Sequence, residues 1–255
     1  MKPYIGVTGF TDQSQVEIAL QSISKVANRH NNPYQLMVGV LVSHKTLDGQ
    51  TNKFPNRYPS IQKIDKLFPD SKDALNLVHF NTHNPKFEPE LEKVIKFGGC
   101  FLHGFQLNIC WPDPRQLELF RKKGNVHQIV LQIGKHAFEQ VERNPKKLVS
   151  KIRSEYQDLV DYILLDASGG YGVQIDVVEI DKYLRQIYSD SLHEHVMVGI
   201  AGGLSGNNLH LISQLVKRYD LLSIDAEGNL RNKEDDSLNT EKMVAYIESA
   251  TTVLY

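Results

Sequence analysis

Short apolar runs rich in β-branched residues alternate with amphipathic stretches along the whole chain. Runs of this kind, bounded by polar and glycine-containing segments, predict strands, whereas apolar residues spaced three and four apart predict helices. The predicted strands cover residues 3–8, 36–43, 75–80, 103–109, 127–133, 161–166, 195–201 and 220–225. The predicted helices cover residues 14–29, 61–68, 88–97, 114–123, 146–157, 177–188, 207–218 and 240–250. At the first helix, Ser14-Gln15-Val16-Glu17 has the sequence of a capping box.

This alternation predicts a parallel sheet, because each right-handed crossover returns the chain to the same end of the sheet. Eight units are the number that closes a (β/α)8 TIM barrel, so we expect residues 1–255 to form one barrel domain. A doubly wound open sheet is the alternative. It usually has a glycine-rich turn after the first strand, and residues 7–12 contain no GxGxxG. The barrel is therefore favoured.

Two long polar segments interrupt the pattern, at residues 44–60 after the second strand and at residues 226–239 after the eighth. Both follow strand ends, so we expect them on the C-terminal face of the barrel, where enzymes of this fold place their chemistry. Loops of this length in a compact domain are typically lids or binding loops.

Composition narrows the functional classes. A formal charge of −1 over 255 residues argues against a nucleic-acid surface, whose mark is a basic excess. No apolar run approaches the ~18 residues of a membrane helix, and the chain enters a strand at once, so we expect a cytoplasmic protein without a signal peptide. Cys100 and Cys110 lack metal-binding spacing and are predicted to be buried, reduced thiols. Monomer and homodimer both remain open.

Glycine clusters follow two consecutive predicted strands. Asp166 ends the sixth strand and precedes Gly169, Gly170 and Gly172, while the pair Gly202-Gly203 follows the seventh strand. Glycine lets backbone N–H groups approach an anion closely, and barrels often bind phosphate in loops of this region. Tight turns alone would also explain each cluster, but two adjacent clusters favour a phosphate site and therefore a phosphorylated small-molecule substrate.

Polar residues at the other strand ends form the rest of a candidate site. Ser43, Asn108 and Gln132 are predicted to orient substrate hydroxyls. Asp166 is predicted to act as acid or base, because partial burial raises the pKa of a carboxyl group. Asp225 and Glu227 follow the eighth strand and would repel a phosphate unless a cation such as Arg231 lay between them.

A metal-dependent hydrolase is an alternative interpretation. His79 and His83 lie on or near one strand, and His44, Asp48 or Asp225 is available as a third ligand. Barrel metal sites usually gather several histidines and carboxylates, so ordinary polar lining is favoured and no metal is assigned. Trp111, the single tryptophan, is predicted to pack over the start of the helix at 114–123.

Several segments of the chain resemble motifs of one known family. They are Val7-Thr8-Gly9-Phe10-Thr11, Phe105-Gln106-Leu107-Asn108, Leu164-Leu165-Asp166 with Gly169-Gly170-Tyr171-Gly172, and Ala201-Gly202-Gly203-Leu204 with Asn207-Asn208. In that order they are similar to the first-strand Cys-Gly motif, the Gln-Leu-His segment, the Leu-Leu-Asp and Gly-Gly-Thr-Gly run, and the Ala-Gly-Gly-Leu motif of phosphoribosylanthranilate isomerase. The resemblance covers most of the chain in the order of its elements.

The resemblance implies a cofactor-free Amadori rearrangement of a phosphoribosyl amine, with Asp166 as general acid and the glycine loops holding the phosphate. The family's cysteine base falls on Thr8, whose hydroxyl needs a partner to take its proton. The family's Asp-Val-Ser-Ser-Gly segment appears here as residues 223–228, with carboxylates in place of hydroxyls. These departures leave a second hypothesis open, a barrel that has lost this reaction and binds a small metabolite or a protein partner.

Overall fold

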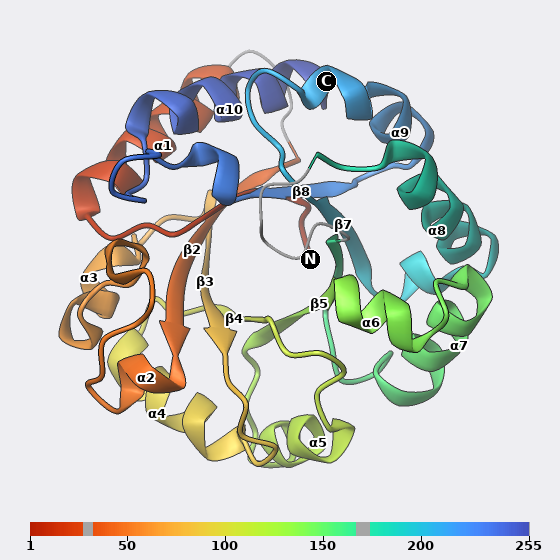
Figure 1. Cartoon of the computed structure of the whole chain (residues 1–255), viewed down its shortest axis with the longest axis horizontal. Helices are drawn as coiled ribbons and strands as arrows, with labels where there is room; N and C mark the ends of the chain where they lie inside the picture. The colour runs from red at the N-terminus through yellow and green to blue at the C-terminus, as the bar shows by residue number, and fades with distance from the viewer. Residues whose placement is uncertain (28–32, 167–173, 255) are drawn as a thin grey trace.

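The computed structural model describes residues 1–27, 33–166 and 174–254 of the chain. Parallel strands close a barrel in the order β1 to β8, with β8 paired to β1, and the helices surround it (Figure 1). The strands are β1 Tyr4–Thr8, β2 Gln35–Ser43, β3 Ala74–Asn81, β4 Gly104–Leu107, β5 Gln128–Gly134, β6 Tyr162–Asp166, β7 Met197–Ala201 and β8 Ser223–Ala226. The predicted (β/α)8 barrel is confirmed, and each predicted strand is present within a few residues of its expected ends.

Side chains alternate between the inside and the outside of the barrel. Tyr4, Met37, Leu77, Tyr162 and Leu164 belong to one buried cluster, and their alternate neighbours join the larger core that packs against the helices. Towards the strand ends the inward positions become polar. The interior of the barrel is therefore filled with apolar side chains, and its polar side chains gather at the C-terminal mouth.

The main helices follow the predicted order. They are α1 Gln13–Ala27, α3 Ile64–Leu67, α4 Glu88–Gly98, α5 Pro114–Lys122, α7 Pro145–Glu155, α8 Val177–Ser189, α9 Ser213–Arg218 and α10 Thr240–Val253. Helix α10 packs against α1 and completes the outer ring (Figure 1). Two short helices, α2 His44–Leu47 and α6 Lys135–Gln140, were not predicted, because each is only about a turn or two long and starts directly after a strand.

Three predicted helix starts differ from the structure. The helix expected from residue 207 begins as a 3-10 turn, Leu209–Ile212, and the helix expected from residue 61 begins as the 3-10 turn Ile61–Lys63. The Ser14–Glu17 capping box is wrong, because α1 is capped two residues earlier. The Asp12 carboxylate accepts the Ser14 N–H at 2.8 Å, and the Gln15 side chain accepts the Asp12 N–H at 3.3 Å.

Two further expectations concern the exposure of the cysteines and the absence of a membrane helix. Cys100 and Cys110 are free but exposed, which corrects the prediction of buried thiols; both lie in connecting segments outside the core. Within the described residues, no helix combines the length and apolar character needed to cross a membrane.

Candidate active site

A cavity opens at the C-terminal mouth of the barrel, at the ends of β3 to β8. Its cavity volume is about 50 Å³. Its lining combines polar side chains with the turn after β7: His79, Gln106, Asn108, Gln132, Asp166, Ala201, Gly202, Gly203, Asp225, Glu227 and Gly228. Concave sites with a few convergent polar groups are the usual place for a small-molecule ligand.

Asp225 is the most perturbed carboxyl group in this cavity. It is the penultimate residue of β8 and is 5% exposed. Its carboxylate accepts hydrogen bonds from Thr8 Oγ1 at 3.2 Å and from Gln106 Nε2 at 3.1 Å, both neutral donors. Burial raises the pKa of Asp225 to about 7, with the charges of Glu227 and Asp166 adding to the effect and the two hydrogen bonds opposing it. The group therefore changes charge near neutral pH.

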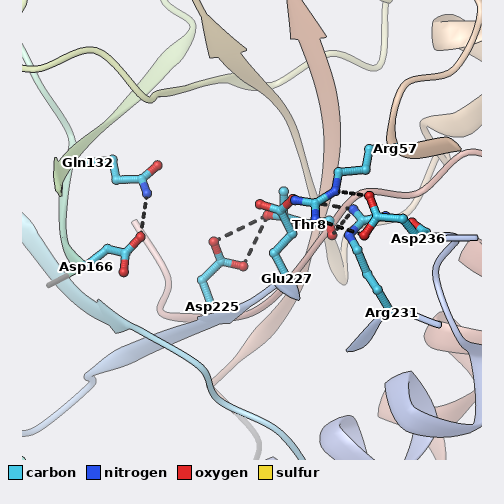
Figure 2. A network of polar contacts seen from close by, with 8 residues as sticks. All are labelled: Thr8, Arg57, Gln132, Asp166, Asp225, Glu227, Arg231 and Asp236. Carbon is cyan, nitrogen blue, oxygen red and sulfur yellow. Dashed lines mark hydrogen bonds and ion pairs between the residues drawn. The ribbon is translucent and has the colours of Figure 1, made fainter. Parts of the chain in front are cut away.

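A pair of glutamines connects Asp225 to Asp166 across neighbouring strands. Gln106 on β4 approaches Gln132 on β5, with 3.4 Å between Nε2 and Oε1. Gln132 in turn donates from Nε2 to Asp166 Oδ2 at 2.8 Å (Figure 2). The two carboxyl groups thus lie in one cavity, at opposite ends of a side-chain amide bridge, and each accepts a hydrogen bond from one of the two amides.

Two glycines make room for the Asp225 cluster. A Cβ at Gly6 on β1 would lie 2.7 Å from Asp225 Oδ1, and a Cβ at Gly39 on β2 would lie 2.6 Å from Thr8 Oγ1. A glycine inside a strand often marks such a close approach. Glycines inside strands are therefore a second sequence signal for the site, in addition to the polar residues at strand ends.

Glu227 lies just beyond β8 and is surrounded by cations. Arg57 Nη1 donates to Glu227 Oε1 at 3.0 Å, and Arg57 also forms a two-point ion pair with Asp236 (Figure 2). Arg231 Nη2 lies 3.5 Å from the same Glu227 oxygen. The cation expected beside the carboxylates is therefore present, and it is a pair of arginines.

Both arginines are held in place by contacts with the surrounding structure. Arg231 is 3% exposed and fits against Gly9, where a Cβ would lie 1.8 Å from Nη2. Arg57 comes from the long segment after β2 and reaches the segment after β8, so it joins the two loops that the sequence placed on this face. Arg57 was missed, because a single arginine in a polar loop carries no sequence signal of its partner.

The turn after β7 is held in a defined conformation. Gly202 and Gly203 have φ values of 124° and 57°, which favour glycine. The Gly203 carbonyl accepts hydrogen bonds from the side-chain amides of Asn208, at 2.7 Å, and Asn229, at 2.6 Å. The turn thereby faces the cavity with its backbone fixed. Gly169, Gly170 and Gly172 lie outside the described residues.

The other predicted site residues divide into two groups. Asn108, Gln132 and Asp166 line the cavity with Gly202 and Gly203. Ser43 and Thr8 are not among the lining residues. The Ser43 hydroxyl donates to Asn52 at 2.6 Å and caps α2, whereas Thr8 is fully buried behind Asp225.

The histidines proposed as metal ligands are separated. His79 lines the cavity, and burial lowers its pKa, which favours the neutral imidazole. His83 is exposed and its ring lies 6.0 Å from that of His44. Among the described residues, no three His, Cys, Asp or Glu side chains gather in a group that could hold a metal ion.

Comparison with known proteins adds solved structures of the same architecture. Triosephosphate isomerase from Bartonella henselae matches with a TM-score of 0.54 and 9% identity, over 98% of this chain and 99% of that one. Tryptophan synthase subunit alpha from Legionella pneumophila str. Paris matches with a TM-score of 0.56 and 10% identity, over 99% and 92%. A structure from Aquifex aeolicus VF5 reaches a TM-score of 0.59 and 15% identity, over 99% and 93%.

These likenesses establish the fold alone. No known family profile matches the sequence, and no curated protein matches it either. The activity has to be argued from the site.

Proposed function

We propose that the mouth cavity catalyses a proton-transfer isomerisation of a phosphorylated sugar derivative, with Asp225 and Asp166 as its acid–base pair. The observation that carries the proposal is the placement of two carboxyl groups in one cavity, one of them with a pKa of about 7. General acid–base catalysis is most efficient when the pKa of the catalytic group lies near the working pH.

The proposal assigns Thr8 a supporting role. The sequence resemblance places the family's base at Thr8, and a hydroxyl at that position requires a proton acceptor. Thr8 Oγ1 donates to Asp225, so the carboxylate that accepts this hydrogen bond is also the group able to remove a proton from a ligand in the cavity. Asp225, as the carboxylate, would then abstract a proton from a substrate carbon, while Asp166, as the carboxylic acid, gives its proton to a substrate oxygen. Loss of the Asp225 proton to solvent and uptake of one by Asp166 restore the starting state after each turnover.

Phosphate binding is proposed at the turn after β7 and at Gly228, both of which line the cavity. Backbone N–H groups at such glycine turns bind anions without requiring a cationic side chain. Arg57 and Arg231 offset the charge of Glu227 next to this position, which removes the repulsion expected from the sequence. Triosephosphate isomerase, by its name an isomerase of a phosphorylated sugar, shows that this fold can carry such a reaction.

The test is turnover of a phosphosugar panel that includes N-(5′-phosphoribosyl)anthranilate, with Asp225→Asn and Asp166→Asn as variants. Each substitution keeps the side-chain shape and removes the proton-transfer group, so we expect kcat to fall by about 10²–10⁴-fold while ligand affinity stays within a few-fold. Phosphate-dependent thermal stabilisation of the unmodified protein should identify the panel members that bind. Unchanged turnover in either variant would remove that residue from the mechanism.

A further inference from the structure

An open groove lies on the outer ring of helices, between α7 and α8, which are neighbours there (Figure 1). Its cavity volume is about 650 Å³, larger than that of the mouth. Four cations line it: Arg143 and Lys146 at and just before the start of α7, and Lys182 and Arg185 on α8. Because the whole chain has a formal charge of −1, these side chains are a local concentration of positive charge.

Nearby carboxylates offset only part of this charge. Arg143 Nη1 lies 2.7 Å from Glu179 Oε1 on α8. Asp181 accepts hydrogen bonds from Arg185 Nε and from Arg218 Nη1, each at 2.8 Å, so one carboxylate serves two guanidinium groups. The Arg143 and Arg185 side chains are still 44% and 65% exposed, and their remaining N–H donors can meet a ligand.

The two lysines of the groove are compensated even less. Lys146 and Lys182 are exposed, and within the described part of the chain neither forms an ion pair. Glu142 also lines the groove, but its carboxylate lies 2.6 Å from Lys147 Nζ. An anion that enters the groove therefore meets two lysine ammonium groups without displacing an existing partner.

Contacts behind the two helices hold the groove in shape. On α8, the Tyr183 ring packs against Phe138 of α6, with centroids 4.7 Å apart. Tyr156, at the C-terminal end of α7, packs against Trp111 at 5.6 Å, and Lys151 Nζ of α7 lies 5.1 Å from the centre of the same indole ring. Trp111 thus holds α7 in place, instead of packing over the start of α5 as the sequence predicted. A groove formed in advance lowers the cost of ordering on binding.

Two ion pairs between the helices mark the length of the groove. One joins Arg143 to Glu179 in the first turn of α8, and the other joins Arg153, near the end of α7, to Asp190, the C-cap of α8. The lining residues of α8 lie between these two pairs. From Glu179 to Asp190 the helix rises by roughly 16 Å. An extended peptide covers that distance with about five residues.

The chemistry of the lining favours a peptide over a nucleic acid. Sites for single-stranded nucleic acid combine cations with aromatic rings on which the bases stack, and none of the described residues that line the groove is aromatic. Gln186 and Ser189 add an amide and a hydroxyl group, which can hydrogen-bond to a peptide backbone. The cations then select acidic side chains, because complementary charge steers association and rejects partners of the wrong sign.

We propose that the groove between α7 and α8 is a docking site for an extended acidic segment of a partner protein, about five residues long and rich in Asp or Glu. Arg143 and Lys146 contact the carboxylates of this segment from one side, and Lys182 and Arg185 contact them from the other. The groove lies on the outside of the barrel, so this interaction is independent of the function proposed for the mouth.

Hexaglutamate labelled with fluorescein is the probe, and fluorescence anisotropy at about 0.15 M NaCl measures its binding to the whole protein. We expect saturable binding that weakens as salt is added, and no saturable binding of labelled hexaglutamine. Absence of saturable hexaglutamate binding, or equal binding of both peptides, would overturn the proposal.

Charge-reversed variants test where the peptide binds. Lys146→Glu with Lys182→Glu places like charges in the groove, and we expect it to weaken hexaglutamate binding about tenfold or more. Lys93→Glu with Lys96→Glu changes the net charge by the same amount at exposed positions of α4, and should leave the affinity nearly unchanged. Equal loss in both double variants would show that the peptide responds to net charge alone, and would refute the site.

An oligothymidine of about ten nucleotides separates the two classes of partner. We expect it to bind the unmodified protein more weakly than hexaglutamate does. Tighter binding of oligothymidine, lost in Lys146→Glu with Lys182→Glu, would overturn the assignment to an acidic peptide in favour of a nucleic acid. The double variants alter exposed positions, so their melting temperatures should match that of the unmodified protein; Lys146→Gln with Lys182→Gln replaces the charge-reversed pair if they do not.

Discussion

Asp225 and Glu227 lie two residues apart at the end of β8 and line the same cavity, but their surroundings differ: Glu227 lies beside cations, whereas Asp225 contacts neutral donors. Glu227 receives charge compensation from Arg57, at 3.0 Å, and from Arg231, at 3.5 Å. Asp225 is more deeply buried, and within the described part of the chain its hydrogen bonds come from the hydroxyl of Thr8 and the amide of Gln106. Neutral donors favour the charged form less than a cation does, so burial dominates at Asp225.

Under the proposed function, the difference separates a structural carboxylate, Glu227, from a reactive one, Asp225. Glu227 joins the segments after β2 and β8 through its ion pair with Arg57, which also pairs with Asp236. This contact requires Glu227 to stay ionised. Asp225 keeps a charge that the protein does little to stabilise. Groups of this kind reduce stability and are retained where a reaction needs them. Substitution of either Asp225 or Glu227 tests this difference.

The largest expected effect is on the pH dependence of stability. The pKa of Asp225 rises from 3.8 to about 7 on folding, so between these values the folded protein binds one proton more than the unfolded chain. The contribution of this group to stability is therefore present at low pH and is lost as pH rises towards 7. Asparagine resembles the protonated form at every pH. Asp225→Asn should match the unmodified protein near pH 3, gain on it steadily from pH 4 to pH 7, and exceed its free energy of unfolding by on the order of 4 kcal/mol at pH 8.

Urea unfolding of both proteins from pH 5 to pH 8 measures this difference. A constant gap across the range would mean that Asp225 titrates normally in the folded protein. In that case the raised pKa on which the proposed mechanism rests would be absent.

A smaller effect of opposite sign is expected at Glu227. Glu227→Gln leaves Arg231, which is 3% exposed, without its main negative neighbour and weakens the Arg57 pair. We expect a loss of about 1–3 kcal/mol in the free energy of unfolding. Because the Glu227 charge helps to raise the pKa of Asp225, the same variant should lower that pKa. Chemical denaturation measures the loss of stability, and the pH–rate profile measures the pKa of Asp225.

Glu118→Gln is the control, since it neutralises an exposed i,i+4 pair with Lys122. Such a pair contributes less than about 0.5 kcal/mol. Equal destabilisation by both substitutions would show that the cluster around Glu227 behaves as an ordinary surface pair.

The barrel could be predicted because its signal is local and repeated. Each strand is an apolar run such as residues 36–43, and each crossover has a helical period, so errors at single ends did not accumulate. The missed parts were short: α2 and α6 are held by strand-end geometry, and the cap at Asp12 competes with an equally good pattern two residues later.

The site was predicted only where its residues fall at strand ends. Gln132, Asp166 and the Gly202-Gly203 turn do line the mouth. The roles of Asp225 and Arg57 could not be read from the sequence, because both depend on partners far along the chain. Asp225 meets Thr8 across 217 positions, and Arg57 meets Glu227 across 170. The burial of Asp225 and the ion pair of Arg57 arise only when the barrel closes and brings these distant residues together.

The finest test concerns how Thr8 acts. Its hydroxyl donates to Asp225 and favours the carboxylate, so Thr8→Val should raise the pKa of Asp225 further and move the acidic limb of kcat/KM to higher pH. Valine has nearly the same shape, and loss of one hydrogen bond should cost about 1 kcal/mol of stability. Above the limb, turnover should remain within a few-fold, and Thr8→Ser should restore the original profile. A large loss of turnover that persists at high pH would instead place the Thr8 hydroxyl in direct contact with the reacting substrate, and Asp225 would then act only as the acceptor of its proton.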